Sequence, residues 1–247
     1  MKEQPEHSLL LKWLTLTGFI FFTIIVAWNE GEILLLYTVD KSHISMAITL
    51  IYLLVTLHCA RRIYTISSET NLSRKIEKII RNENKININI NDDQVLINSK
   101  TQLPQCLMAE YIRDLCFRNS KISESEDNGS SSDLNDVYNS RLKGPQEIGW
   151  FVSDMMLKLG LLGTIIGFIF MLGSVANIAD FDVSNMQKIL RHMSDGMGTA
   201  LYTTLVGLVC SVLSAMQYHM IDRHADELIE LTRHMTQVHV IPKINNN

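Results

Sequence analysis

Charge is scarce in this 247-residue sequence, and so are the residue patterns that build metal or disulfide sites. Charged residues make up 19% of the chain against 47% hydrophobic residues, which excludes an ordinary soluble domain. The net charge of −4 gives no general attraction to nucleic acid, so we expect no nucleic-acid partner. Four cysteines are present, but no two have CxxC spacing, and we expect ordinary apolar residues without disulfides.

The apolar residues gather in four long blocks, 9–28, 44–60, 155–176 and 199–218. A helix needs roughly 20 apolar residues to cross a lipid bilayer, and each block comes close to that length. The pattern predicts an all-α integral membrane protein with four transmembrane helices. No small-residue cleavage site follows the first block, so it is interpreted as a retained span rather than a signal peptide. Residues 33–39 either lengthen the first span or lie in the membrane interface.

The distribution of charge predicts how the chain is oriented in the membrane. Basic residues outnumber acidic ones just after the second block, at Arg61, Arg62, Arg74, Lys75, Lys78, Arg81 and Lys85. By the positive-inside rule this segment is cytoplasmic. The same topology puts the N- and C-termini in the cytoplasm and the loops 29–43 and 177–198 on the outer side.

Helical stripes continue beyond two of the four blocks. Isoleucines recur at helical spacing after the second block, at Ile63, Ile66, Ile76, Ile79 and Ile80, and a second stripe follows the fourth block, at Ile221, Ala225, Leu228, Thr232 and Met235. Spans two and four are therefore expected to extend into a cytoplasmic helical region, where the two extensions pack together. Residues 82–93 fit either a short strand or a disordered link, and residues 123–136 are expected to be a flexible linker.

The third and fourth blocks share a pattern of small and hydroxyl side chains. With about 100° between successive residues, one face of the third block carries Gly160, Thr164, Gly167, Met171 and Ser174, with Gly163 at its edge. The fourth block repeats the pattern with Gly196, Ala200, Thr203, Thr204, Gly207, Ser211 and Ser214. Small residues let helix backbones touch in lipid, so one interpretation is helix packing alone. The other is that paired threonines near mid-span line a narrow hydrated path.

Acidic residues are missing from the interior of all four blocks. Proton paths in membranes commonly contain Asp, Glu or His, so an ion-conducting protein of this sequence would take its titrating carboxylate from another chain. Lys158 lies one turn after Asp154, and a local ion pair or snorkelling explains it better than a place in an ion path. No cluster of His, Asp and Glu and no nucleophile–base pair accompanies the blocks, so we expect no enzyme, catalytic residue, metal or cofactor.

Two motifs in these blocks carry a resemblance to a known family. "GLLGTIIGF" at 160–168 and "GTALYTTLVGLVCSV" at 198–212 resemble the two pore-helix signatures of the MotA/TolQ/ExbB family of proton-channel stator subunits. The resemblance covers residues 149 to 235. Many members have a proline before the first motif, where this chain has Leu157 and Lys158, and this departure puts a proline-dependent bend of the helix in doubt.

The resemblance implies how the chain is divided and what it assembles with. Residues 1–60 would hold the N-terminal tail and spans one and two, 61–148 a cytoplasmic segment with the flexible linker, 149–220 the pore helices three and four, and 221–247 a cytoplasmic C-terminal helix and tail. Family members are multi-pass proteins of the bacterial inner membrane. A homopentamer is implied, around single-span partner subunits resembling MotB, ExbD or TolR, which would supply a membrane aspartate.

The resemblance also implies which residues carry the function. Thr164 matches the threonine of the family's GLxGT motif, and Thr204 matches the threonine before xxGL; Thr203, nearer the middle of the projected face, is the second choice. Pore-helix packing is assigned to Gly160, Gly163, Gly167 and Gly207. The implied function is an ion-driven stator or energy-transducing subunit that couples flow of H⁺ or Na⁺ to motion of, or around, the partner. The alternative is a passive membrane scaffold that assembles by packing of its glycine stripes.

Overall fold

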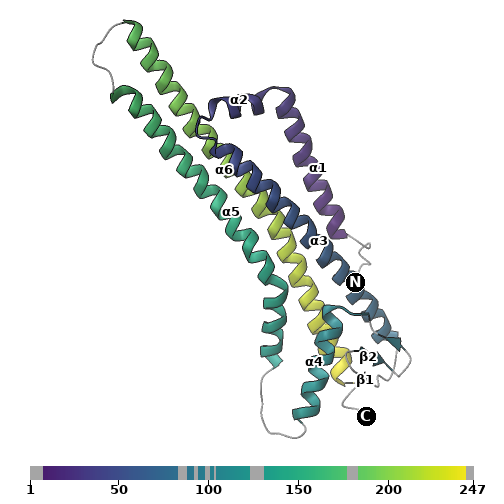
Figure 1. Cartoon of the computed structure of the whole chain (residues 1–247). Coiled ribbons are helices and arrows are strands. Elements are labelled where there is room, and N and C mark those ends of the chain that lie inside the picture. Colours follow the sequence, from purple (N-terminus) through teal and green to yellow (C-terminus); the bar gives the residue numbers. More distant parts are fainter. Residues whose placement is uncertain are drawn as a thin grey trace. The chain divides into compact units, whose positions relative to one another are not determined.

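The computed structural model of the chain describes residues 8–82, 88–91, 94–97, 101–102, 104–122, 131–176 and 183–242 (Figure 1). Its helices are α1 (Ser8–Asn29), α2 (Glu32–Val39), α3 (Ile44–Asn82), α4 (Leu107–Ile122), α5 (Ser131–Ala176) and α6 (Val183–Met235), followed by the π-helical turn η1 (Thr236–Val240). Three short strands, β1 (Ile88–Asn91), β2 (Gln94–Ile97) and β3 (Thr101–Gln102), form an antiparallel sheet in the order β1-β2-β3.

Four of these helices, α1, α3, α5 and α6, are long and apolar enough to cross a membrane. The prediction of a helical protein with four apolar spans is therefore confirmed. Helices α3 and α6 each run without a break well past the predicted spans, which confirms the predicted extensions of spans two and four. Strand β1 falls within residues 82–93, where the sequence left a strand or a link open.

The predicted linker 123–136 is wrong in its second part, because α5 already begins at Ser131. Tyr138 and Leu142 lie one helical turn apart and are both buried, and Leu134 packs against the cluster that includes Tyr138. An apolar stripe at this spacing anchors the first turns of a helix. Residues 123–130 of the predicted linker lie outside the described residues.

Helices α1 and α2 separate at a glycine. Gly31 has φ of +76°, a backbone conformation that residues with a Cβ rarely adopt. Helix α1 ends just before it and α2 begins just after it, so residues 33–39 belong to a helix of their own and do not lengthen the first span (Figure 1). Leu34 and Leu35 of α2 are exposed, which suits a short helix lying in a membrane interface.

Helix α3 begins on an aspartate cap. The buried Asp40 carboxylate accepts hydrogen bonds from the backbone N–H groups of Ser42 at 2.9 Å and Ser45 at 2.8 Å, and from the Ser42 hydroxyl at 2.6 Å. Burial alone would raise the pKa of Asp40, but these hydrogen bonds to the ionised form outweigh it and hold the pKa below its ordinary value. The negative charge also faces the positive end of the α3 dipole, so the cap fixes where the second span starts.

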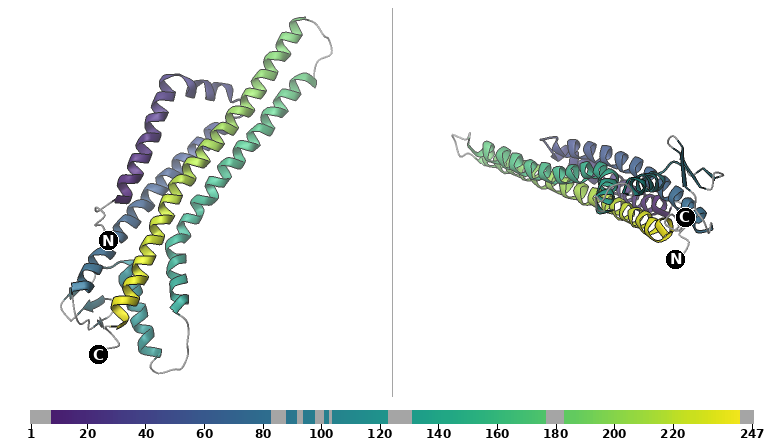
Figure 2. Two further views of the ribbon diagram at one scale, coloured as in Figure 1. Left: turned by 180° about the vertical axis from the view of Figure 1, so that it is seen from behind. Right: turned by 90° about the horizontal axis from the view of Figure 1, so that it is seen from below.

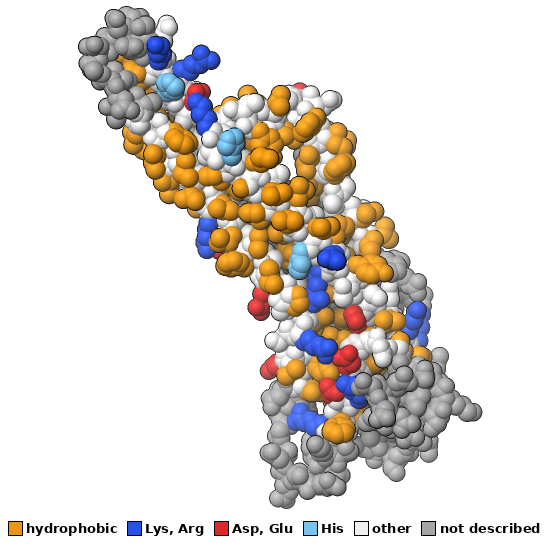
Figure 3. Space-filling view, in the orientation of Figure 1, with side chains coloured by type: hydrophobic (Ala, Val, Ile, Leu, Met, Phe, Trp, Pro, Cys, Tyr) orange, Lys and Arg blue, Asp and Glu red, His pale blue; other side chains and the backbone are white. Residues whose placement is uncertain are grey.

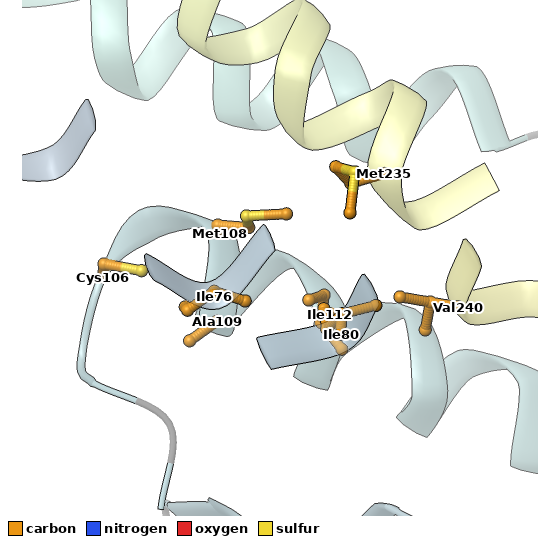
Figure 4. Packing of buried hydrophobic residues seen from close by; sticks show 8 residues of the cluster. All are labelled: Ile76, Ile80, Cys106, Met108, Ala109, Ile112, Met235 and Val240. Carbon is orange, nitrogen blue, oxygen red and sulfur yellow. The ribbon is translucent and has the colours of Figure 1, made fainter. Parts of the chain in front are cut away.

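The chain separates into two compact units. Unit 1 comprises Met1–Leu11, Arg62–Pro145 and Ile221–Asn247. Its core joins residues of α3, α4, α6 and η1 with the residue just before α4, namely Ile76, Ile80, Cys106, Met108, Ala109, Ile112, Met235 and Val240 (Figure 4). The predicted stripes are buried at Ile63, Ile66, Ile76, Ile80, Ile221, Ala225, Leu228, Thr232 and Met235. The prediction that the two helical extensions pack together is therefore confirmed.

Unit 2 comprises Lys12–Arg61 and Gln146–Met220. In it, α3, α5 and α6 run side by side (Figure 2) and share a cluster of the buried residues Ile48, Tyr52, Met156 and Cys210. Hydrophobic side chains cover most of the visible surface of this unit (Figure 3). Such a surface suits lipid rather than water, because a soluble protein rarely exposes an apolar patch of this extent.

Candidate functional site

Glycines bring α5 and α6 into backbone contact. A Cβ built on Gly207 would lie 2.8 Å from the Cα of Gly160 and 2.9 Å from the carbonyl oxygen of Met156. A Cβ built on Gly167 would lie 2.6 Å from the backbone nitrogen of Ala200. Real Cβ atoms do not approach other atoms this closely, so these positions have room for glycine alone. The two helices therefore touch along their glycines within one chain.

Gly163 lies at the centre of this contact, not at the edge where the helical projection put it. A Cβ on Gly163 would overlap the side chain of Thr203, which is fully buried beneath it. The Thr203 hydroxyl donates to the carbonyl oxygens of Thr199 at 2.9 Å and Ala200 at 3.0 Å in its own helix. The contact forms at Gly163 because the closest approach of two helices selects the residue without a side chain. Thr203 fills the space that Gly163 leaves.

Thr204 and Thr164 flank the contact. The Thr204 hydroxyl lies 3.0 Å from the carbonyl oxygen of Ala200 and 3.3 Å from that of Gly160 across the helix pair. Thr164 follows Gly160 by one turn, and its hydroxyl donates to the carbonyl oxygen of Leu161 at 2.5 Å. Both threonines are half-buried. The structure thus brings the two motif threonines to one layer of the helix pair and to the same side of it.

The side that carries Thr204 is turned away from α3. Val206 and Leu213 of α6 pack against the cluster that contains Tyr52 of α3. Residues two apart on a helix point in nearly opposite directions, about 200° apart, so Thr204 points away from the side that Val206 gives to α3. Leu208, one turn after Thr204, is exposed. In the single chain the threonine side of α5 and α6 is therefore open.

Charged side chains stay at the ends of the apolar part of this helix pair. In the part that the structure describes, none occurs in α5 after Lys158 or in α6 between Asp195 and His219. The predicted local ion pair is confirmed, since the Lys158 ammonium lies 2.6 Å from the Asp154 carboxylate, with both side chains exposed. No group of three or more His, Cys, Asp or Glu that could hold a metal ion occurs among the described residues.

The other end of the apolar part is joined to the segment before α3. Lys41 forms an ion pair with Asp195 at 2.8 Å, and the Thr199 hydroxyl donates to the carbonyl oxygen of Val39 at 2.9 Å. A Cβ on Gly198 would lie 2.7 Å from the Val39 side chain. These contacts tie the start of the second span to α6 and so help to fix the position of the helix that carries Thr203 and Thr204.

Sequence reasoning missed a set of polar contacts that lie at the Asp154 end of the pair and beyond it, on the side away from the threonines. The Ser153 hydroxyl donates to the carbonyl oxygen of Ser211 at 2.8 Å, which joins α5 to α6. The hydroxyl of the fully buried Tyr218 lies 2.9 Å from Nδ1 of His58, and its ring fills the space where Gly149 has no side chain. These residues come from three helices, so no single stretch of sequence signals the contact.

A family model matches the part of the chain that holds this helix pair. The matched residues are 139–234, which include all four contact glycines and all three threonines. Residues 139–234 form a MotA/TolQ/ExbB proton channel family domain. No curated protein and no solved structure matches the chain. The family match confirms the resemblance that the two motifs indicated.

MotA/TolQ/ExbB proteins are non-enzymatic channel subunits, which agrees with the expectation that the chain is not an enzyme. They belong to the bacterial inner membrane, and four helices of this chain are long and apolar enough to cross a membrane. The family also implies a partner of the MotB, ExbD or TolR kind.

Proposed function

We propose that this chain is the stator-type channel subunit of an ion-driven membrane complex. The observation that carries the proposal is the position of the Thr164 and Thr204 hydroxyls, in one layer and on the open side of the α5–α6 pair. Copies of the pair arranged as a homopentamer would turn these open sides toward a common axis. The threonines would then form a ring of hydroxyl groups inside an otherwise apolar wall. Thr203, which is fully buried beneath Gly163, is the weaker candidate.

The ring needs a carboxylate from another chain, because the apolar parts of α5 and α6 contain no acidic residue in their described portion. An aspartate in the membrane helix of a MotB-, ExbD- or TolR-like partner would supply it. Hydroxyl groups can hold water or coordinate a cation beside that carboxylate, so either H⁺ or Na⁺ can be the transported ion. Binding of the ion neutralises a charge that is costly to hold in an apolar environment, and this lets the ring step around the partner helices.

The orientation in the membrane follows from the basic residues after the second span. We place both termini, the segment 61–148 and the tail 221–247 in the cytoplasm, on the strength of the cluster that begins at Arg61 and Arg62. Residues 149–220 then carry the ion path, and the Lys41–Asp195 ion pair lies at its outer end. A stator subunit of this kind transmits motion and needs no catalytic residue.

The alternative, a passive scaffold assembled by glycine packing, finds less support. It requires glycine stripes on the surface of the chain, where a second copy could reach them. Gly160, Gly163, Gly167 and Gly207 instead pack α5 against α6 within one chain. They therefore build the subunit, and the assembly of subunits must use other residues of the exposed helix faces.

Native mass spectrometry of the purified chain, with and without the product of a neighbouring gene that encodes a single membrane span, tests this proposal. The proposal predicts five copies of this chain around two copies of a partner that carries a membrane aspartate. A homo-oligomer that forms without any such partner and conducts no ions would favour the scaffold instead.

A further inference from the structure

Two buried polar groups of α6 have no hydrogen-bond partner within the described chain. They are the hydroxyl of Ser214 and the side-chain carbonyl of Gln217, and both residues are 0% exposed. The two residues are three positions apart, so their side chains share one face of the helix. Nε2 of Gln217 lies 3.5 Å from the hydroxyl of Tyr52 in α3, at the outer limit of a hydrogen bond. We call Tyr52, Ser214 and Gln217 the inner polar cluster.

Ser214 differs from the other buried hydroxyl residues of α6. Thr203 and Thr232 of α6, and Thr236 of η1, each donate to the carbonyl oxygen four residues earlier, which satisfies the hydroxyl without a tertiary partner. Ser214 makes no such bond, although any serine in a helix can reach the backbone carbonyl oxygen four residues earlier. Its hydroxyl is therefore available to a group within the contact of α3, α5 and α6.

Lipid offers these groups nothing to bind. A buried carbonyl or hydroxyl left without a partner loses the hydrogen bond that it would make in water, and this loss exceeds the cost of holding one water molecule in place. Buried waters in proteins typically make about three hydrogen bonds to otherwise unsatisfied polar groups. The inner polar cluster offers two such groups on α6, and the Tyr52 hydroxyl, which accepts from Nε2 of Gln217, supplies a third polar group from α3.

We propose that the inner polar cluster binds an ordered water molecule inside the membrane-spanning part of the subunit. The water donates one hydrogen bond to the Gln217 carbonyl and accepts one from the Ser214 hydroxyl. It forms a third hydrogen bond with the Tyr52 hydroxyl. The next residue, Tyr218, is bonded to His58, whose side chain is exposed, so polar groups continue from the cluster to the surface of the unit. The site is internal to one subunit and separate from the threonine layer.

Radiolytic hydroxyl labelling of the chain in lipid nanodiscs tests this inference, because an X-ray pulse converts bound water into radicals that modify side chains next to it. The reporters are Tyr52 and Cys210, which are 7% and 9% exposed and lie in one packed cluster. We expect Tyr52 to be modified in the native chain and several-fold less in Gln217→Leu. The control Met216→Leu, on an exposed position of the same helix, should leave the labelling of Tyr52 at the native level. Equal labelling of Tyr52 in the native chain and in Gln217→Leu would overturn the proposal.

A second variant and a second measurement keep the test decisive if Gln217→Leu fails to fold. Ser214→Ala removes only a hydroxyl, and we expect it to fold and to lower the labelling of Tyr52. The melting temperature of each variant separates a hydrated cluster from a dry one. In a dry cluster both substitutions delete unpaired polar atoms and raise the melting temperature, which would contradict the inference; in a hydrated cluster they lower it.

Discussion

Replacing Gly207 by alanine tests the close contact of α5 and α6 that places the threonines. The added methyl group would lie 2.8 Å from the Cα of Gly160 and 2.9 Å from the carbonyl oxygen of Met156. Both are backbone atoms, which cannot rotate away, so the helices must move apart. Overpacking of this kind costs about 1–3 kcal/mol. Alanine also favours a helix over glycine by roughly 0.5–1 kcal/mol, so we expect a net loss of up to about 2.5 kcal/mol.

Gly173→Ala is the matched control, because Gly173 lies in α5 and its Cβ would meet nothing within 4 Å. The alanine there should be neutral or should stabilise the chain by up to about 1 kcal/mol, through helix preference alone. Equilibrium unfolding in mixed micelles measures both free energies under the same conditions. If Gly207→Ala proved as stable as Gly173→Ala, the backbone contact between the two helices would not exist as described.

Three further predictions concern single residues. Thr203→Val keeps the shape of a side chain whose hydroxyl is bonded only within its helix, so it should change the free energy of unfolding by less than about 1 kcal/mol and leave ion flux intact; loss of flux would return Thr203 to the ion path. Asp40→Ala should lose about 1 kcal/mol of stability at pH 7, because it removes the cap of α3. Because folding lowers the pKa of Asp40, the ionised cap stabilises the native chain fully above the ordinary carboxyl pKa, near 4. This stabilisation is lost as the pH falls through the lower pKa of the folded chain. The melting temperature of Asp40→Ala should lack this pH dependence. Lys158→Gln breaks an exposed ion pair and should cost less than about 0.5 kcal/mol without affecting flux, and a large flux defect would show that Lys158 belongs to the ion path.

Much of the fold could be predicted from the sequence because membranes impose long apolar helices. The lengths of the apolar blocks identified the four spans, and the isoleucine stripe that includes Ile66 and Ile76 identified the continuation of α3, since both signals depend on one helix at a time. The break between α1 and α2 was not predicted, because Gly31 ends α1 only through its positive φ, which the sequence does not show. The early start of α5 depends on the packing of Tyr138 against other elements of unit 1, which a local pattern does not contain.

In the candidate site, too, features of a single helix were predicted from the sequence, and features that depend on packing between helices were not. The motifs selected the glycines and threonines, but the rotation of α5 about its axis depends on α6, so the projection put Thr164 on the face and Gly163 only at its edge. The structure reverses the two, because closest packing favours glycine at the contact. Gln217 was not singled out, since its meaning depends on the absence of a hydrogen-bond partner for its carbonyl among the described residues of three helices.

Ion flux through the assembled complex shows whether the threonine layer carries the ion. The complex of this chain with its single-span partner would be reconstituted in liposomes that contain a pH-sensitive dye, with a parallel set for Na⁺, and driven by an imposed gradient. We expect the native complex to conduct, and Thr204→Val to abolish the flux while the subunit count in native mass spectrometry stays the same. A Thr204→Val complex that assembles normally and conducts at the native rate would contradict this expectation.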